Sequence, residues 1–498
     1  MRPVFSRDVK RSQEWLAQAL HLEENDDIIV RPFRSMGLSC ALYFVDGLVS
    51  ADITAQAVLR PLMECRAEAR GDQALALARD SLVLCPDLKE ESSPEAAIDG
   101  LMHGLCLVLM DTVPRAIVVD ARTFVKRAVT TPQTETVVIG PHEAFVETLR
   151  DNLTLLHRLL PTPDLICKME AVGTRVSTKL AVCYLRGVCP EETVAELTRR
   201  LSGSALDDVL TIGLLSQLIE DDPLSPLPQA LSTERPDRAA SFLLEGQAVV
   251  LLDGSPRCLA MPISLWHLFH APDDSYMRWQ YGTFMRLIRA LGAALALLLP
   301  ALFVSVVTFH PVALPMSLLT NIIQSRSIVP VSLFFEAMLM LLVFDLINEA
   351  GTRIPGLLGS SFGLVSALIL GTAAVDAGLV SPLLLIVVAL SGVGSYALPD
   401  YSLSFAFRMG QMALLIAGGL MGLPGVCLML LWMILRVAGM QSLGKPYLAP
   451  TAPRRVRNPD LLLRAPVYRL RLRGDSANPR AMLRAMGRMR RWRRREGR

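Results

Sequence analysis

The chain has 498 residues, of which 52% are hydrophobic, and this length suits two or three domains. A mean hydropathy of +0.39 excludes an ordinary soluble enzyme as the whole protein. The net charge of +3 is unevenly distributed: residues 1–283 hold 27 basic and 39 acidic side chains, residues 284–435 hold five of each, and residues 436–498 hold 18 and three.

The N-terminal half shows neither a cleavable signal nor a disulfide framework. The first 20 residues lack the apolar core of a signal peptide, so we expect residues 1–283 to stay in the cytoplasm. The nine cysteines are scattered, without a CxxC pair, and several fall in apolar runs, as at Cys40, Cys106 and Cys183. This usage indicates reduced, buried thiols.

Two stretches of this half recur later in the chain. The run ALYFVDGLVSADITAQAVLRPL begins at Ala41, and the similar AVCYLRGVCPEETVAELTRRL begins 140 residues later, at Ala181. The run SPEAAIDGLMHGLCLVLMDTVPRAI begins at Ser93, and its counterpart begins 142 residues later, at Arg235. Two matches at nearly one offset favour a tandem duplication of α/β units, with convergent strand–helix patterning as the alternative.

The duplication predicts which residues correspond. Gly47 should match Gly187 and Asp111 should match Asp253, with both glycines in tight turns at strand ends. The predicted fold class is therefore α/β plus a polytopic α-helical membrane domain: two tandem, duplicated cytoplasmic units followed by four to six membrane helices. The expected boundaries are 1–139 for the first unit, 140–160 for a connecting helix, 161–283 for the second unit, 284–438 for the transmembrane domain and 439–498 for a basic tail.

The predicted transmembrane domain contains five apolar stretches, each long enough to cross roughly 30 Å of hydrocarbon as a helix. They are 290–309, 329–348, 354–375, 377–399 and 409–435. Glycines and Pro424 divide 411–438, which predicts either a re-entrant hairpin or one kinked helix.

One of these stretches carries acids. A charged side chain in hydrocarbon costs roughly 2.5–3.5 kcal/mol on insertion scales, so Glu336 and Asp345 require an explanation. At about 100° per residue they point to opposite faces, whereas Asp345 and Glu349 share a face. We expect other helices or subunits to enclose this helix. We also expect the acids either to form structural ion pairs or to act in ion conduction. The candidate partners are water in a pore, Arg326, Arg353 and Arg408.

The C-terminal tail predicts the topology. Its many Lys and Arg residues place it in the cytoplasm by the positive-inside rule, so both termini are expected there and the number of crossings should be even. Arginines surround Trp492 near the end of the chain, which favours binding to anionic lipid over a solvated tail or nucleic-acid binding.

Motifs for catalysis give little. The segment GSSFG (359–363) matches G-x-S-x-G but opens an apolar helix, where a nucleophile elbow needs a preceding strand. His267 and His270 are spaced as a possible metal pair, but a helix cap explains them more simply. No Walker A loop and no G-x-G-x-x-G occurs. We expect no enzymatic activity, no cofactor and no metal.

Segments spread over nearly the whole chain resemble the GerA family of spore germination proteins, the A-type subunits of spore nutrient receptors. These segments are FVDGLV (44–49), GPHEAFVETL (140–149), QLIEDDPLSPLPQALSTERPDRAASFLLEGQAVVLLDGSP (217–256), PALFVSVVTFHP (300–311), INEAGTRIP (347–355), PDYSLSFAFR (399–408), GKPYLAP (444–450) and LLRAP (462–466). The family-motif residues singled out here are Asp46, Gly47, Glu234, Arg235, Pro236, Asp237, Asp253, Gly254 and His310. The short N-terminus is more similar to the stage V sporulation protein AF branch.

The resemblance implies a multi-pass protein of the spore inner membrane in an endospore-forming bacterium, belonging to a family whose A-type subunits form ring-shaped oligomers that release ions. Two departures bear on ion selectivity. Residues 340–343 lack an acid that family members often carry, and Val312 stands where an acid is expected after TFHP.

We therefore expect a non-enzymatic membrane subunit of a spore germination complex that oligomerises and forms or gates an ion-release pathway. A non-conducting scaffold that assembles partner germination proteins is the alternative, and a membrane hydrolase acting through Ser361 comes third. The expected partners are further copies of the chain, other germination membrane proteins and anionic lipid, without nucleic acid.

Overall fold

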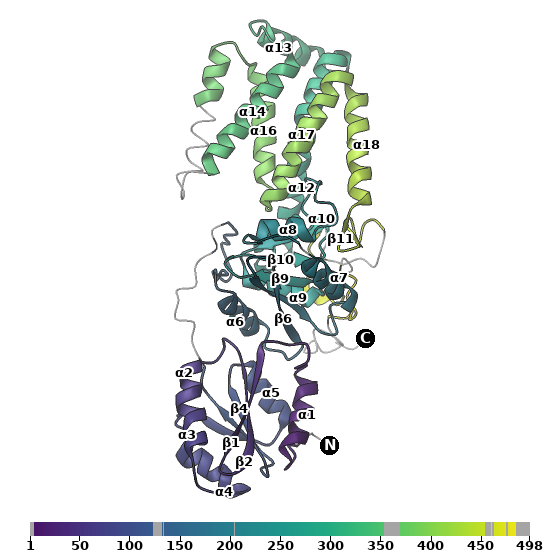
Figure 1. Cartoon of the computed structure of the whole chain (residues 1–498). Coiled ribbons are helices and arrows are strands. Elements are labelled where there is room, and N and C mark those ends of the chain that lie inside the picture. Colours follow the sequence, from purple (N-terminus) through teal and green to yellow (C-terminus); the bar gives the residue numbers. More distant parts are fainter. Residues whose placement is uncertain are drawn as a thin grey trace, which may run out of the picture.

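The computed structural model describes residues 4–122, 132, 134–203, 205–352, 369–453, 460, 463–474 and 477–484. These residues form an elongated molecule in which three parts follow one another (Figure 1). A first α/β unit lies at one end, a second α/β unit lies in the middle, and a region of long helices lies at the other end. The predicted α/β character of the N-terminal half and the helical character of the C-terminal part are confirmed.

The first unit is an antiparallel sheet with helices on both faces. Its strands are β1 (Ile28–Ser35), β2 (Leu38–Val45), β3 (Leu88–Glu91), β4 (Cys106–Met110) and β5 (Ala116–Val119), in the order β1-β2-β4-β5-β3. Its helices are α1 (Val9–Ala19), α2 (Ala51–Ile53), η1 (Thr54–Leu59), α3 (Arg60–Glu64), α4 (Asp72–Leu77), η2 (Ala78–Leu82) and α5 (Pro94–Met102). Side chains alternate between faces along a strand, so Leu42 faces the core shared with α3, whereas Tyr43 faces the core shared with α1 and α5.

The second unit repeats this plan. Its strands are β6 (Leu165–Val172), β7 (Thr178–Leu185), β8 (Leu231–Thr233), β9 (Ala248–Leu252) and β10 (Cys258–Met261), in the order β6-β7-β9-β10-β8. Its helices are α6 (Leu149–Leu159), α7 (Glu191–Ser202), α8 (Ile212–Ile219), α9 (Pro236–Glu245), α10 (Leu265–Leu268) and α11 (Asp273–Tyr276). Helices α6 and α9 cover one face of the sheet, and α7 and α8 cover the other.

The two units also share hydrogen bonds at corresponding positions. The amide of Asp111 donates to Ser39 at 3.0 Å, and the amide of Asp253 donates to Lys179 at 3.0 Å. The Asp111 carboxylate accepts from the first amide of α1, at Val9, and the Asp253 carboxylate accepts from the first amide of α6. These correspondences are what an internal duplication requires, although common ancestry of the units stays a prediction.

The helix expected over 140–160 is α6, and it begins later and belongs to a core. Leu153 and Leu156 of α6 pack on the second sheet. The turn after β2 approaches the other side of α6, where Asp46 pairs with Arg150 at 2.7 Å and Gly47 lies against Thr154. Helix α6 therefore lies between the two units and contacts both.

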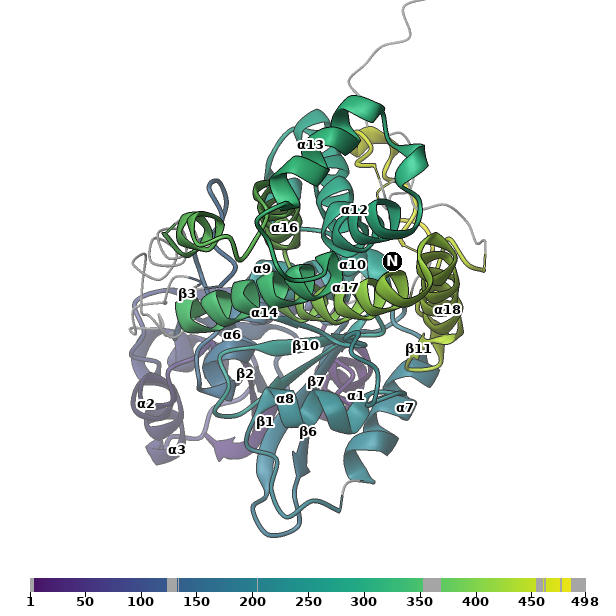
Figure 2. The same cartoon turned by 90° about the horizontal axis from the view of Figure 1, so that it is seen from above.

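The helical region, residues 279–439, stands over the second unit (Figures 1 and 2). Its described helices include α12 (Trp279–Phe309), η3 (Pro311–Ala313), α13 (Met316–Arg326), α14 (Leu333–Thr352), α16 (Pro382–Tyr396), α17 (Tyr401–Met421) and α18 (Leu423–Gly439). Among the described residues, α12 and α17 are long and apolar enough to cross a membrane, and α16 and α18 are shorter apolar helices. The stretch 354–375 lies mostly outside the described residues, so four to six membrane helices stay a prediction.

Glycine breaks the last predicted stretch in two. Gly422 has φ +68°, a conformation that only glycine adopts readily, and it separates α17 from α18. The two helices run side by side as a hairpin (Figure 1), and the chain approaches itself closely where Gly425 meets Ala417. The segment is therefore a hairpin and not a single kinked helix, and its first helix, α17, begins before the predicted stretch, at Tyr401, and is 21 residues long.

Two glycines at corresponding strand ends provide a matched test of the contact between the units. Gly47 has φ +85° and Gly187 has φ +75°, so alanine at either position pays the cost of left-handed backbone, about 1–2 kcal/mol. A Cβ at Gly47 would also collide with the Thr154 hydroxyl, whereas a Cβ at Gly187 would have nothing within 4 Å. We expect Gly47→Ala to lower the thermal unfolding temperature of the purified protein clearly more than Gly187→Ala. Equal losses would show that the turn does not press on α6.

Candidate functional site

Helix α14 carries two acids on opposite faces, and each meets polar groups of other helices. Glu336 is buried, with 1% of its surface exposed. Its Oε1 accepts hydrogen bonds from the amide and the hydroxyl of Ser381, at 2.5 and 2.6 Å. Ser381 is the residue before the first turn of α16, where the helix dipole favours a negative charge. Glu336 therefore joins α14 to the start of α16.

The second oxygen of Glu336 is less well compensated. Oε2 lies 3.6 Å from Nε of Arg326, beyond hydrogen-bond distance, and both atoms are buried without a hydrogen-bond partner among the described residues. A buried carboxylate oxygen without a hydrogen bond is costly and uncommon. The contacts of the described residues therefore do not explain why an acid occupies this position. Arg326 itself ends α13 and donates to the carbonyl of Val331 at 3.3 Å.

Asp345 lies nine residues further along α14, half a turn around the helix and about 13 Å along its axis. Its Oδ1 is 3.3 Å from Nη1 of Arg408 on α17. Nearby, the Tyr396 hydroxyl of α16 donates to the Asn348 side chain of α14. Two of the three arginines expected as partners therefore lie beside these acids. Arg353 lies outside the described residues, and Glu349 is exposed.

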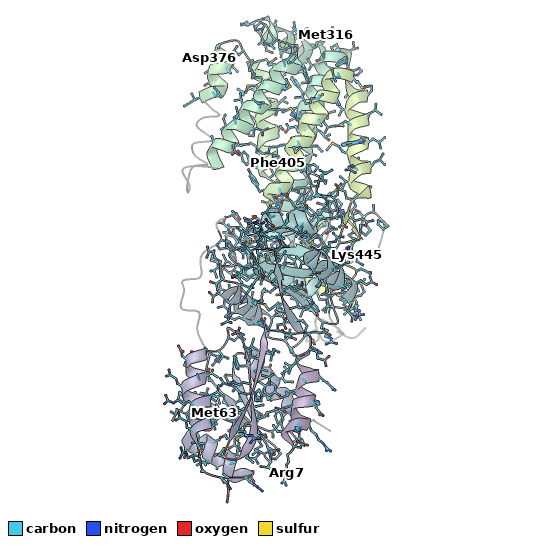
Figure 3. The ribbon with its side chains drawn as sticks, in the orientation of Figure 1. Arg7, Met63, Met316, Asp376, Phe405 and Lys445 are labelled. Carbon is cyan, nitrogen blue, oxygen red and sulfur yellow. The ribbon has the colours of Figure 1, made fainter. Side chains whose placement is uncertain are left out.

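A cavity of about 870 Å³ separates this end of the helices from the second unit. Arg408, Asn348 and Tyr396 line it from the helical side. From the second unit and the segment before it come charged side chains, among them Glu135, Glu220 and Arg257. The cavity lies where the helices meet the second unit, near the end of α17 that carries Phe405, whereas Met316 lies at the far end of the helices (Figure 3).

Helix α12 is fixed to the second unit by buried charges that the sequence analysis did not single out. Arg289 binds both oxygens of Asp274 at 2.7 and 3.0 Å, and Arg286 contacts Asp274 at 3.2 Å. Arg286 also binds Asp460 of the tail at 3.0 Å. A signal was present in the sequence, since two arginines spaced i, i+3 precede the apolar run of the longest described helix. Their partners, however, are distant in sequence.

The motif residues 234–237 hold the segment that leads into the second unit. Glu234 Oε1 accepts from the amides of Thr134 and Glu135 at 2.6 and 2.8 Å. Arg235 is fully buried, pairs with Asp237 at 2.9 Å and donates to the carbonyl of Pro141 at 2.9 Å. Pro236 opens α9, where its missing amide costs nothing. These side chains lie in the second unit, away from the acids of α14.

The remaining motif residues are also distant from those acids. Asp46 and Gly47 contact α6, and Asp253 and Gly254 lie at its first turn, where the Gly254 amide donates to Glu147 at 2.8 Å. His310 ends α12 at the far end of the helical region, and its Nε2 is buried without a hydrogen-bond partner among the described residues.

Neither of the two other chemical motifs forms a catalytic or metal site among the described residues. Ser361 lies outside the described residues. His267 accepts a hydrogen bond at Nδ1 from the Ser264 amide in a capping box of α10, and burial lowers the pKa of its imidazole to about 4. His267 is therefore a neutral capping residue near physiological pH.

Comparisons with known proteins match nearly the whole chain. The profile of the family described as "Bacillus/Clostridium GerA spore germination protein" matches residues 16–476. The chain is 33% identical to spore germination protein GerLA of Bacillus cereus, over 86% of this chain and 87% of that protein. It is 33% identical to spore germination protein B1 of Bacillus subtilis (strain 168), over 92% and 95%, and 30% identical to the membrane protein YfkQ of the same strain, over 93% and 90%.

Among solved structures, the chain matches the crystal structure of the N-terminal domain of the A subunit of the Bacillus megaterium spore germinant receptor GerK3. The match has 24% identity and a TM-score of 0.41, and it covers 53% of this chain and 97% of that domain.

The buried charges at the start of α12 lead to a stability prediction. Changing Arg289 to Gln removes the bidentate partner of Asp274, and breaking a buried ion pair costs about 3 kcal/mol or more. We expect Arg289→Gln to lower the unfolding temperature of the detergent-solubilised protein strongly. Arg278→Gln, at an exposed arginine just before the same helix, should leave it nearly unchanged. Similar values for the two variants would contradict the role given to this ion pair.

Proposed function

The chain belongs to the Bacillus/Clostridium GerA spore germination protein family, and from that premise we propose that it is a membrane subunit of a germination complex that oligomerises and forms or gates an ion-release pathway. The subunit is not an enzyme in this proposal. Its work is to hold, open or line a path for ions while the spore leaves dormancy.

The acids of α14 carry the proposal. A membrane helix retains ionisable groups where they face a bundle interior, a water-filled cavity or a charged partner. Glu336 and Asp345 contact different helices from opposite faces of α14. In a membrane, both faces would therefore have to be covered by protein or water and not by lipid. Within the described part of the chain only one oxygen of Glu336 is hydrogen-bonded, and the other faces Arg326 across a gap of 3.6 Å.

We assign different roles to the two acids. Glu336 borders the ion path in this proposal, because its second oxygen is buried but has no hydrogen-bond donor among the described residues, so an ion or a water molecule that reached it would complete its contacts. Asp345 helps to hold the helices together through Arg408, and this pair adjoins the cavity above the second unit. A shift of the second unit would change the surroundings of Arg408, which gives a physical route from the cytoplasmic units to the helices.

The proposed topology is a multi-pass protein of the spore inner membrane with both termini in the cytoplasm and four to six membrane helices. The tail supports a common side for the two ends: Arg480 pairs with Glu191 at 2.6 Å, and Arg473 donates to Leu244 at 2.7 Å, so the described tail residues pack on the second unit. The described ends of the chain therefore lie on one side of the helical region.

The proposal also covers the binding partners of the chain and the origin of its two α/β units. Copies of the chain assemble as a ring, other germination membrane proteins bind to it, and the basic end of the tail binds anionic lipid, without nucleic acid. The two α/β units arose by duplication, supported by their common strand order. GerLA and B1 are named as spore germination proteins, and YfkQ is named as a membrane protein.

A non-conducting scaffold is the second candidate. The same contacts favour it if they serve only to hold helices together. Ser381 donates a hydrogen bond to Glu336, and Arg408 pairs with Asp345. The two candidates differ in what happens when the charge of Glu336 is removed and its shape is kept.

Glu336→Gln tests this difference. The amide can still accept from Ser381, so the protein should fold and assemble, while ion release from germinating spores should fall or change in selectivity because the charge at the path is gone. Ion release is measured from spores in which the variant replaces the wild-type chain, and assembly is measured by native gel. Asp376→Asn, at an exposed acid before α16, is the control and should release ions as the wild type does.

Asp345→Asn provides the contrast. It leaves Arg408 without its carboxylate, so we expect assembly to weaken before conduction through assembled complexes changes. Unchanged release and selectivity in Glu336→Gln spores with normal assembly would make this acid structural and would favour the scaffold.

A further inference from the structure

A second group of buried polar side chains lies far from the helices, where the first unit meets the second. Asp27 lies between α1 and β1 of the first unit, His157 lies on α6, and Cys167 lies on β6. Asp27 is 5% exposed, His157 1% and Cys167 0%. Each offers one atom that binds metals, and these atoms all lie within 4.8 Å of one another.

The distances are close to those around a small metal ion. Nε2 of His157 is 3.1 Å from Oδ2 of Asp27 and 3.9 Å from Sγ of Cys167. With metal–N and metal–O bonds of about 2.0–2.1 Å and a metal–S bond of about 2.3 Å, tetrahedral coordination puts N and O ligands about 3.3 Å apart and N and S ligands about 3.6 Å apart. The two distances from His157 are therefore each within a few tenths of an ångström of the values around one ion, and the Asp27 and Cys167 donor atoms lie within 4.8 Å of each other.

A fourth donor lies beside Cys167, outside the group of three whose atoms are all within 4.8 Å of one another. Cys183 stands directly opposite Cys167 in the antiparallel pair β6–β7, so both thiols lie on the sheet face that α6 covers. Cys183 is also fully buried. Imidazole nitrogen, carboxylate oxygen and thiolate sulfur are all donors that zinc accepts, and four of them closed off from solvent suit its tetrahedral coordination.

The local chemistry shows what such a site would change. Contact with Cys183 and burial raise the pKa of the Cys167 thiol well above its usual value, so this thiol is neutral unless a cation displaces its proton. The other ring nitrogen of His157, Nδ1, is buried without a hydrogen-bond partner among the described residues. Within the described residues, the polar contacts of the imidazole are therefore made by Nε2, to Asp27 and Cys167.

We propose that Asp27, His157, Cys167 and Cys183 bind one divalent transition-metal ion of the zinc class. The ion fastens the first unit to the second, because Asp27 belongs to one unit and the other three ligands to the other. It adds to existing contacts at the same place, where the Asn25 side chain donates to Leu165 at 3.2 Å and the Asp26 amide donates to Cys167 at 3.2 Å. Binding releases the thiol protons to solvent.

The test uses the purified full-length protein in detergent, kept reduced, with Zn²⁺ and Co²⁺ as the probes. We expect about one equivalent of Co²⁺ to produce a thiolate-to-cobalt absorption band, and Zn²⁺ to abolish this band by displacement. Zn²⁺ should raise the unfolding temperature, a chelator should reverse that rise, and affinity should fall as pH is lowered, because protons compete for the ligands. A wild-type protein without the cobalt band and without a Zn²⁺-dependent thermal shift would overturn the proposal.

Variants assign the ligands. Cys167→Ser and Asp27→Asn should weaken Zn²⁺ binding at least tenfold, and Cys167→Ser should remove most of the cobalt band. Cys189→Ser is the matched control, since Cys189 is a buried cysteine that packs in the opposite core of the second unit and should leave binding unchanged. Loss of the band in Cys189→Ser with retention in Cys167→Ser would overturn the assignment. If Cys167→Ser fails to fold, the wild-type titration still decides whether the ion binds.

Discussion

A carboxylate buried in an apolar helix has to be compensated where it lies, and in this chain that requirement determines how the helices meet. Glu336 takes two hydrogen bonds from Ser381 at the start of α16 and faces Arg326 at the end of α13. Asp345, on the opposite face of α14, pairs with Arg408 on α17. Because the acids point in opposite directions, α14 is tied to its neighbours on two sides, and a change on one side has a physical connection to the other.

The same requirement connects the helices to the two α/β units. Arg286 and Arg289 at the start of α12 are buried, and Asp274 and Asp460 neutralise them from the second unit and the tail. The cavity lined by Arg408 lies at this junction. The second unit is in turn joined to the first through α6, against which Gly47 packs. Charge compensation and close packing thus form a continuous set of contacts from the first unit to α14.

Local patterns in the sequence predicted much of this. Apolar runs inside the two repeats indicated corresponding elements such as β4 and β9. Helical periodicity placed Glu336 and Asp345 on opposite faces of one helix. Two expected partners, Arg326 and Arg408, also lie beside the acids. These features depend on short-range spacing, which a single sequence shows directly.

The features that the sequence did not predict depend on contacts between distant segments. Ser381 is a common helix-starting residue, and nothing in its neighbourhood indicates a bond to Glu336, 45 residues away. Asp27 and His157 are 130 residues apart, so no metal-binding spacing appears, and the expectation of no metal rested on the absence of such a spacing. The break at Gly422 was visible as a glycine and proline cluster, but the length of α17 was not, because polar residues such as Arg408 and Gln411 interrupt the apolar run that packs against α12.

The most direct test of the central claim is the structure of the purified complex by single-particle electron microscopy. We predict a closed ring of identical chains with a water-filled axial passage, to which the Glu336 carboxylate of every copy, buried in the single chain, becomes open. A ring or a monomer with no continuous aqueous passage beside α14, in which Glu336 stays as enclosed as it is in the single chain, would contradict it.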